Sequence, residues 1–179
     1  MLPWSAGTGS SHASCRTSSL AATMAAMETD SALPSIDEHE ISLDVPPPVA
    51  WTAVVAVFGR LMTRPEWRLF AKAIRCKPDH AVGTAVAAGD ALPGFLVVRC
   101  EAPTEWALEG QHLFSRYALT FRIAPVDSEH CRVAAHSSAE FPGVHGKMYR
   151  AVVIGSGGHA VGVRNILRSI KTEAEHSRN

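Results

Sequence analysis

The spacing of apolar residues changes period three times along the chain. Residues 36–45 alternate between apolar and polar side chains, which predicts a half-buried strand whose apolar face is formed by Ile41, Leu43 and Val45. Three consecutive prolines at 46–48 end this strand, and proline is favoured in the first turn of a helix. Apolar residues then recur at helical spacing over 51–61 and again over 65–74. This region therefore predicts one strand followed by two short helices.

Beyond residue 81 the apolar residues return to a spacing of two, which is typical of strands. Pairs such as Gly89-Asp90 and Asp127-Ser128 separate the segments and indicate tight turns. Consecutive strands joined by such short turns must be antiparallel, because parallel pairs need long crossovers. The expected strands are a weak one over 81–88 and clearer ones over 95–100, 105–109, 115–123 and 130–141.

The C-terminal region carries a helical stripe. Pro142-Gly143 end the last strand, and apolar residues then follow three- and four-residue steps while lysine and arginine occupy the other faces. The stripe consists of Met148, Val152, Gly155, His159, Val163, Ile166 and Ile170. We therefore predict an α+β fold in which a curved antiparallel sheet wraps around one long C-terminal helix, with two short helices after the first strand.

Both ends of the chain lack a sustained apolar period. Residues 1–33 are rich in serine, alanine, threonine and glycine, so they cannot bury enough apolar surface to offset the entropy lost on ordering. We expect disordered tails over 1–33 and 173–179 around one domain over 34–172, and deletion of the first tail should leave the fold intact. A mis-assigned start codon, which would exclude residues 1–26 from the native protein, and a genuine flexible extension explain the first tail equally well.

The balance of charge limits the possible partners. Seventeen basic and seventeen acidic residues give a formal net charge of zero, whereas nucleic-acid-binding proteins normally carry a basic excess. We therefore expect no nucleic-acid partner. No apolar run reaches the ~18 residues of a membrane-spanning helix, and the N-terminal residues match a secretory signal poorly. These observations predict a cytoplasmic protein without a membrane span, and they leave its oligomeric state open.

The four cysteines are scattered along the chain, at Cys15, Cys76, Cys100 and Cys131, and no two of them form a CxxC pair. Structural zinc needs paired thiolates or imidazoles at short spacing, so that two ligands reach one tetrahedral ion. Cys76 followed by His80 is half of such a site at best. We therefore expect no metal site and interpret the cysteines as reduced thiols.

Four stretches of the sequence resemble a known superfamily: EISLDVPPPVAWTAV, GDALPGFLVV, HLFSRYALTFRI and AEFPGVHGKMYRAVVIGSGGHAVGVRNILRSIK. Together with the order of elements they are similar to the SRPBCC superfamily, the helix-grip fold of START-related lipid-transfer domains, the birch-pollen allergen and polyketide cyclases. The resemblance covers residues 36–172, and the last two stretches resemble an actinobacterial-type branch whose members are uncharacterised.

The resemblance implies an apolar cavity between sheet and helix that binds lipids, hormones or polyketides. Only some members of the superfamily are enzymes, and they share no invariant catalytic motif. No catalytic residue is therefore assigned to this chain, and the fold alone does not supply a function.

A glycine motif in the C-terminal stripe could suggest a dinucleotide site. Gly155, Gly157 and Ala160 satisfy GxGxxA, but such a site needs a strand-to-helix turn within a βαβ unit and a second strand that ends in an acidic residue. The residues after Ala160 instead predict one helix with basic faces. We therefore expect no cofactor, and we expect the glycines to permit a bend in the helix.

The predicted cavity should be lined by the apolar faces of the strands and of the final helix, because these faces must meet to be buried. Tyr117 and His159 are the polar members and would orient a ligand, while His112, near a turn, is a weaker candidate. The expected ligand-binding residues are Trp106, Tyr117, Phe121, Met148, Val152 and His159.

Three functions are compatible with the sequence. The first is a module that binds an apolar, lipid-like or polyketide-like small molecule. The second is an enzyme of the cyclase/dehydratase type that uses His159 or Tyr117 as a proton donor. The third is an interaction protein with a filled core. A cavity with polar groups inside it is expected for the first two and not for the third.

Overall fold

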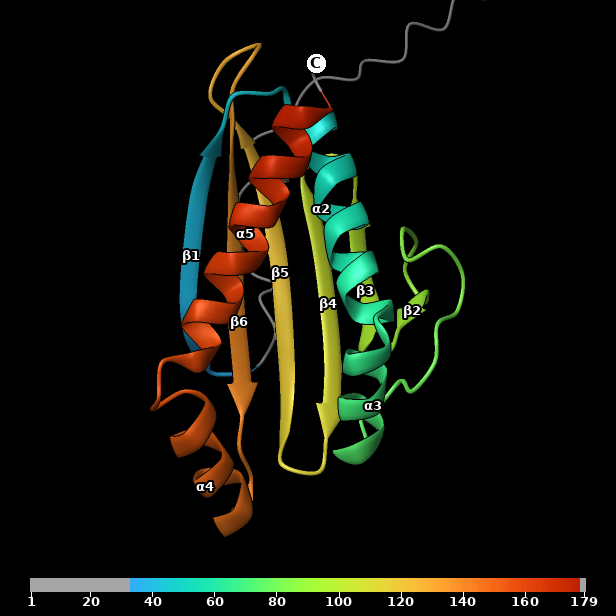
Figure 1. Ribbon diagram of the computed structural model, residues 1–179, viewed down its shortest axis with the longest axis vertical. Helices are drawn as coiled ribbons and strands as arrows, with labels where there is room; N and C mark the ends of the chain where they lie inside the picture. The colour runs from blue at the N-terminus through green and yellow to red at the C-terminus, as the bar shows by residue number, and fades with distance from the viewer. Residues whose placement is uncertain (1–32, 178–179) are drawn as a thin grey trace, which may run out of the picture. The chain divides into compact units, whose positions relative to one another are not determined.

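The computed structural model describes residues 33–177, which form one α+β unit. The predicted N-terminal tail therefore lies outside the described residues, apart from Leu33. Six strands form one sheet in the order β1-β6-β5-β4-β3-β2, and every neighbouring pair is antiparallel (Figure 1). The strands are β1 (Ser35–Leu43), β2 (Ala91–Leu92), β3 (Phe95–Glu101), β4 (Glu105–His112), β5 (Ser115–Pro125) and β6 (Cys131–Glu140).

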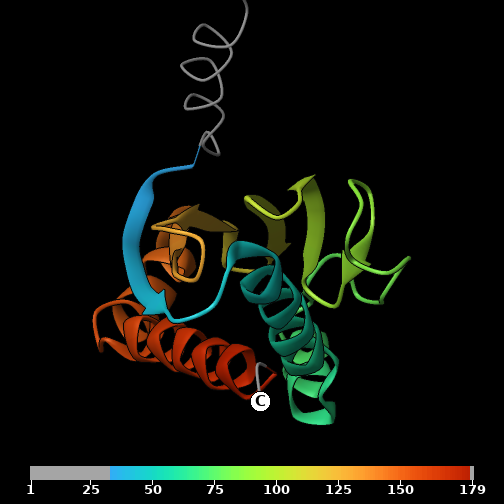
Figure 2. The same ribbon diagram turned by 90° about the horizontal axis from the view of Figure 1, so that it is seen from above.

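Helices cover one face of this sheet. They are α2 (Pro47–Thr63), α3 (Pro65–Ala73), α4 (Gly143–Val153) and α5 (Gly158–His176). Viewed from above, the strands form an arc, and α2 and α5 lie on its inner side (Figure 2). This arrangement confirms the predicted helix-grip fold. Within residues 33–177, no helix is long and apolar enough to cross a membrane.

The core centres on one aromatic ring of α2. Phe58 is 1% exposed and packs edge-on against Phe95, Trp106 and Phe121, with ring centroids 5.2, 5.7 and 5.4 Å away. Edge-to-face packing of this kind stabilises aromatic pairs beyond the area they bury. Phe58 therefore fastens α2 to three neighbouring strands.

The segment predicted as a weak strand over 81–88 is a loop instead, so that prediction was wrong. Only Val82 pairs with the sheet, in an isolated bridge to Ala91 of β2. The N–H groups of Thr84, Val86 and Ala87 instead donate to Oδ2 of Asp90 at 3.1, 3.2 and 3.2 Å. A carboxylate that accepts several backbone N–H groups satisfies them without a neighbouring strand.

The predicted single C-terminal helix is two helices, α4 and α5, separated by residues 154–157. Gly157 has φ of 75°, a left-handed conformation that glycine adopts without the penalty other residues pay. Gly155 also lies so close to the carbonyl of Ala151 that a Cβ would collide with it. The glycines expected to permit a bend thus interrupt the helix completely.

α5 extends further than predicted. Residues 173–176 were expected in a disordered tail, but they form the last turn of α5. Ala174 is fully buried, and Glu173 forms an ion pair with Arg60 of α2 at 2.7 Å. The prediction of a tail beginning at 173 was therefore wrong, because buried contacts hold this turn in place.

Candidate functional site

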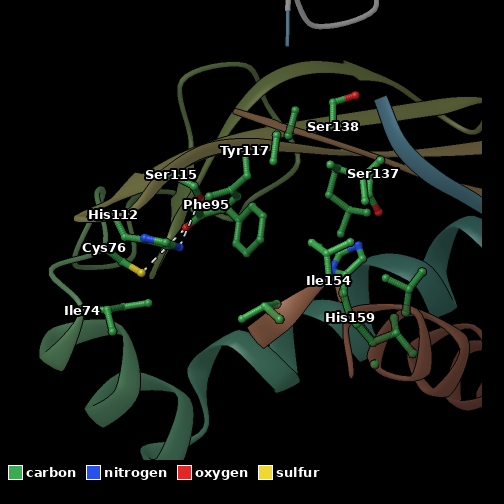
Figure 3. A pocket seen from close by; sticks show the side chains of 18 of the residues that line it. Ile74, Cys76, Phe95, His112, Ser115, Tyr117, Ser137, Ser138, Ile154 and His159 are labelled. Carbon is green, nitrogen blue, oxygen red and sulfur yellow. Dashed lines mark hydrogen bonds between the residues drawn. The ribbon is translucent and has the colours of Figure 1, made fainter. Parts of the chain in front are cut away.

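A cavity of about 420 Å³ lies between the sheet and the helices. Side chains of β5 and β6 form its floor, α2 and α3 form one wall, and α4 and α5 form the other. Most of the lining is apolar, with polar groups gathered in two clusters. Figure 3 shows one cluster around His112 and Tyr117 and the other around Ser137 and His159.

We call the first cluster the aromatic end; it consists of Cys76, His112, Ser115, Tyr117 and Tyr149. The Tyr117 hydroxyl donates to the carbonyl oxygen of Gly94 at 2.7 Å and lies 3.7 Å from the Cys76 sulfur. Burial raises the pKa of Tyr117 far above its ordinary value, and the neighbouring Cys76 adds to this effect. The Tyr117 hydroxyl therefore stays protonated, and its proton is already used in the hydrogen bond to Gly94.

Both ring nitrogens of His112 also have hydrogen-bond partners. Its Nδ1 accepts the backbone N–H of Phe114 at 3.1 Å, so in the neutral ring the proton is on Nε2, which donates to Ser115 Oγ at 3.3 Å. Burial lowers the pKa of His112. The aromatic end thus contains a neutral, fixed imidazole.

Tyr149 closes the aromatic end from α4. Its ring stacks on Phe114 at 5.2 Å and meets the His112 ring at 4.9 Å. Burial raises the pKa of Tyr149 as well. Among the described residues nothing is hydrogen-bonded to its hydroxyl, which leaves this group available to a molecule in the cavity.

We call the second cluster the polar end; it consists of Ser137 and His159, which line the cavity, and of Asp37 and His39, which adjoin them without lining it. Asp37 Oδ2 lies 3.3 Å from Nε2 of His39, and Asp37 Oδ1 lies 3.4 Å from Nε2 of His159. Neither contact has the geometry of a hydrogen bond, although both nitrogen–oxygen distances fall within the range of an ion pair. One carboxylate of β1 is therefore flanked by two imidazoles, one from its own strand and one from α5.

Ser137 lies beside this carboxylate, because Asp37 and Ser137 are directly opposite each other in the β1–β6 ladder. Ser137 is 3% exposed, it lines the cavity, and its hydroxyl has no hydrogen-bond partner. In the described part of the chain, five buried side-chain polar atoms lack a partner, and four of them belong to the polar end. Such atoms are costly in a folded protein, so their concentration in one place calls for an explanation.

Residues 33–177 contain no group of three His, Cys, Asp or Glu side chains placed to hold a metal ion. The glycine motif at 155–160 lies between two helices of a protein whose strands are all antiparallel. It therefore lacks the strand-to-helix turn that positions a dinucleotide.

The structure brings two of the six predicted ligand-binding residues into the cavity wall, Tyr117 and His159. Trp106 and Phe121 face the helices as expected, but the ring of Phe58 packs against both and itself lines the cavity. Their predicted place in the lining was wrong, because strand alternation gives the face of a residue and not what covers it.

Met148 and Val152 are 65% and 69% exposed, and they lie outside the cavity. The prediction assumed one continuous helical period through residues 154–157. Because the helix is interrupted there, the residues of α4 that face the cavity are not the ones that the period of α5 would give. The residues of α4 that line the cavity are Tyr149 and Val153, one position further along.

Several site residues were missed by the sequence analysis. Asp37 and His39 continue the alternation of Ile41 and Leu43 toward the N-terminus, so the same period that predicted β1 could have placed them on its inner face. Ser137 alternates in the same way with its apolar neighbours in β6. No signal in the sequence indicated Tyr149.

The fold and the site together define a helix-grip protein with an internal cavity. No protein-family model matches the sequence, and comparison with curated proteins gives no match. Solved structures similar to this one include a Streptomyces aromatase/cyclase, which shares 14% identity over 80% of this chain and 94% of that one, with a TM-score of 0.49. Norcoclaurine synthase from Thalictrum flavum, a point mutant bound to a transition-state analogue, shares 13% over 80% and 95%, with a TM-score of 0.48. A conserved protein from Geobacillus kaustophilus shares 18% over 78% and 95%, with a TM-score of 0.47.

Proposed function

We propose that the protein is a cytoplasmic, ligand-binding member of the SRPBCC superfamily, of its actinobacterial-type branch, and that it holds an apolar small molecule with a hydroxyl group in the cavity. The observation that carries this proposal is the polar end, where four buried polar atoms lack partners beside an apolar cavity. Ligand sites commonly combine apolar walls with a few polar groups that fix orientation.

The size of the cavity supports this proposal. A volume of about 420 Å³ falls in the range of roughly 300–1,000 Å³ that is common for small-molecule sites. Protein interiors are otherwise packed as densely as organic crystals, so an interaction protein with a filled core would not have such a space. The third function left open by the sequence is therefore disfavoured.

The chemistry of the polar end favours a hydroxyl group on the ligand. Asp37 does not itself line the cavity, but it lies opposite Ser137 and 3.4 Å from His159, which do. A carboxylate only accepts hydrogen bonds, so Oδ1 of Asp37 needs a donor, whereas the Ser137 hydroxyl can donate or accept. A hydroxyl serves both groups at once. A carboxylate offers no donor and would be repelled by Asp37.

The test compares two ligands with the same chain, decanol and decanoate, by isothermal titration calorimetry at pH 7.5. We expect decanol to bind about tenfold more tightly, since a hydrogen bond to a charged group contributes roughly 1.5–3 kcal/mol. Asp37→Asn should remove most of this preference, because the amide offers a donor to a carboxylate. Equal affinities in the wild-type protein, unchanged by Asp37→Asn, would contradict the proposal.

A matched pair of tryptophan variants locates the binding site. Gly162 of α5 lines the cavity where it is exposed to solvent, and a Cβ there would meet nothing within 4 Å. Gly162→Trp should therefore obstruct the mouth of the cavity and weaken decanol binding. Val152→Trp adds the same ring to an exposed position and should leave binding unchanged.

A second function, acid–base catalysis of the cyclase/dehydratase type, is favoured by one specific contact. The carboxylate of Asp37, 3.4 Å from His159, can orient the imidazole and stabilise it when it takes up a proton. His159 could then remove a proton from the carbon between a ketone and a β-hydroxyl group and return that proton to the departing hydroxyl, which leaves as water as the carbon–carbon double bond forms. Tyr117 is a poorer proton donor, since its hydroxyl is bound to Gly94.

The catalytic hypothesis is tested with a β-hydroxy ketone that carries a decyl chain, by following the absorbance of the enone product. His159→Gln should bind this compound and form no enone. If the wild-type protein binds the ketone without releasing water, the protein is a binding module only.

A further inference from the structure

α4 has two apolar faces, although a helix needs only one to pack against its own protein. Tyr149 and Val153 line the cavity from one face. Val144, Met148 and Val152 recur every four residues along the other, and they are 71%, 65% and 69% exposed. The second face takes no part in the core, so folding does not account for it.

Exposed apolar residues continue on α3, beside the mouth of the cavity. The mouth is where lining residues are exposed to solvent, at Phe70 of α3, which is 45% exposed, and at Gly162 of α5. Among the described residues twelve large apolar side chains are exposed, and six of them lie on α3, the β4–β5 turn and α4. These six are Leu69, Phe70, Leu113, Val144, Met148 and Val152.

These three elements lie at the same end of the sheet (Figure 1) and are joined to one another. The backbone N–H of Leu113 in the β4–β5 turn donates to the carbonyl of Ile74, just after α3, at 3.1 Å. Phe114 of the same turn stacks on Tyr149 of α4. We call α3, this turn and α4 the rim.

The rim is positively charged, although the whole chain is neutral. Arg68, Lys72, Lys147 and Arg150 are all exposed, and in the described part of the chain no carboxylate is paired with them. Against these four basic residues, α3 carries one acidic residue, Glu66, and α4 carries none. The rim therefore has an excess of positive charge.

The other end of the sheet is acidic and has a single exposed apolar residue in its turn, Val126. The β5–β6 turn lies there (Figure 1) and carries the acidic residues Asp127 and Glu129. Apolar exposure and positive charge thus coincide at the rim and are not a general property of the surface.

We propose that the rim docks the protein onto the surface of an anionic lipid bilayer, with the mouth of the cavity facing the lipid. Apolar side chains flanked by lysine and arginine are what an interfacial helix presents to such a surface. The apolar residues come from three separate elements, and a lipid surface can accept them because it requires no complementary shape. This docking does not depend on the ligand, so it is tested on the protein alone.

The test is sedimentation of the full chain with vesicles of phosphatidylcholine and phosphatidylserine in equal amounts, and with vesicles of phosphatidylcholine alone. We expect binding to the anionic vesicles that weakens at high salt. Lys147→Glu combined with Arg150→Glu should weaken this binding at least about tenfold. Each lysine or arginine close to an anionic membrane surface contributes about 1 kcal/mol to the free energy of binding.

The matched control is Arg164→Glu combined with Arg168→Glu, which makes the same change in net charge on α5. This control should bind nearly as the wild type does. Equal losses in both double variants would mean that net charge alone is responsible and would overturn the proposal.

A further variant, Met148→Ser with Val152→Ser, tests the apolar contribution and should also weaken binding. Absence of binding to anionic vesicles would overturn the proposal. So would a dimer in solution that this serine variant dissociates, because the exposed face would then join two copies of the chain.

Discussion

The two polar clusters of the cavity differ in how completely their hydrogen bonds are made. At the aromatic end the side-chain polar atoms of His112, Ser115 and Tyr117 have partners within the protein, and the hydroxyl of Tyr149 on α4 is the exception among the described hydroxyl groups there. At the polar end Asp37 Oδ1, His39 Nε2, Ser137 Oγ and His159 Nε2 do not. A satisfied cluster stabilises the fold, whereas an unsatisfied one lowers its stability and gains from a ligand. The contrast indicates that one end serves structure and the other serves binding.

The largest effect is expected from the backbone that supports the aromatic end. Gly110 lies opposite Tyr117 in the β4–β5 ladder, and a Cβ at Gly110 would lie 2.7 Å from the tyrosine ring and collide with the carbonyl of Gly94. Gly110→Ala should therefore lower the free energy of unfolding by about 3 kcal/mol, the upper range for overpacking. Urea denaturation measures this, with Gly59→Ala as a control because nothing lies within 4 Å of its Cβ.

Removal of the Tyr117 hydroxyl should have the next largest effect. Tyr117→Phe leaves the buried carbonyl of Gly94 without its donor, which should cost about 1.5 kcal/mol of stability. Decanol affinity should stay the same, since Tyr117 offers no free group to a ligand. A loss of affinity without a loss of stability would show that the aromatic end takes part in binding.

The sharpest comparison makes one chemical change at both ends. Ser115→Ala removes the partner of His112 and should destabilise the fold by about 1 kcal/mol. Ser137→Ala removes an unpartnered buried hydroxyl and should stabilise the fold by about 1 kcal/mol, while it weakens decanol binding. Both are measured by chemical denaturation and calorimetry. If both variants changed the free energy of unfolding in the same direction, the proposal that one end stabilises the fold and the other binds a ligand would be contradicted.

The smallest effect concerns pH. Burial lowers the pKa of His112 in the folded state, so the unfolded chain takes up a proton first as the pH falls below about 6.5. Stability should therefore decrease as the pH is lowered from 7.5 to 5.5. His112→Asn keeps a hydrogen-bonding group that cannot be protonated, and it should show a smaller decrease in the urea midpoint over the same range.

Much of the fold could be predicted from the sequence because most of its helices and strands are indicated by residues close together in the chain. The alternation in β1 and the proline run before α2 depend only on neighbouring residues, and the structure has both elements close to the predicted bounds. The loop at 81–88 could not be predicted in this way. The Asp90 carboxylate accepts hydrogen bonds from three of its backbone N–H groups. Hydrogen bonds of this kind do not produce a periodic pattern of apolar residues in the sequence.

The cavity lining was harder to predict, since a side chain on the inner face can be covered by a side chain from another element and so be kept out of the cavity. Tyr117 and His159 were found because each is polar on an otherwise apolar face. Trp106 was misplaced because Phe58, distant in sequence, covers it. Met148 was misplaced because the interruption at Gly157 reset the helical phase. Alternation along a strand is a local property, whereas the lining of a cavity depends on tertiary packing.

The interruption between α4 and α5 also has an electrostatic consequence. A continuous helix would have its N-terminus near residue 143, whereas the break creates a second N-terminus at Gly158, one residue before His159. The aligned peptide dipoles give this end a partial positive charge, which favours a nearby anion by roughly 0.3–1 kcal/mol. Oδ1 of the Asp37 carboxylate lies 3.4 Å from Nε2 of His159, whose side chain extends from the first turn of α5. The same glycines that shorten the helix thus help to hold a negative charge at the polar end of the cavity.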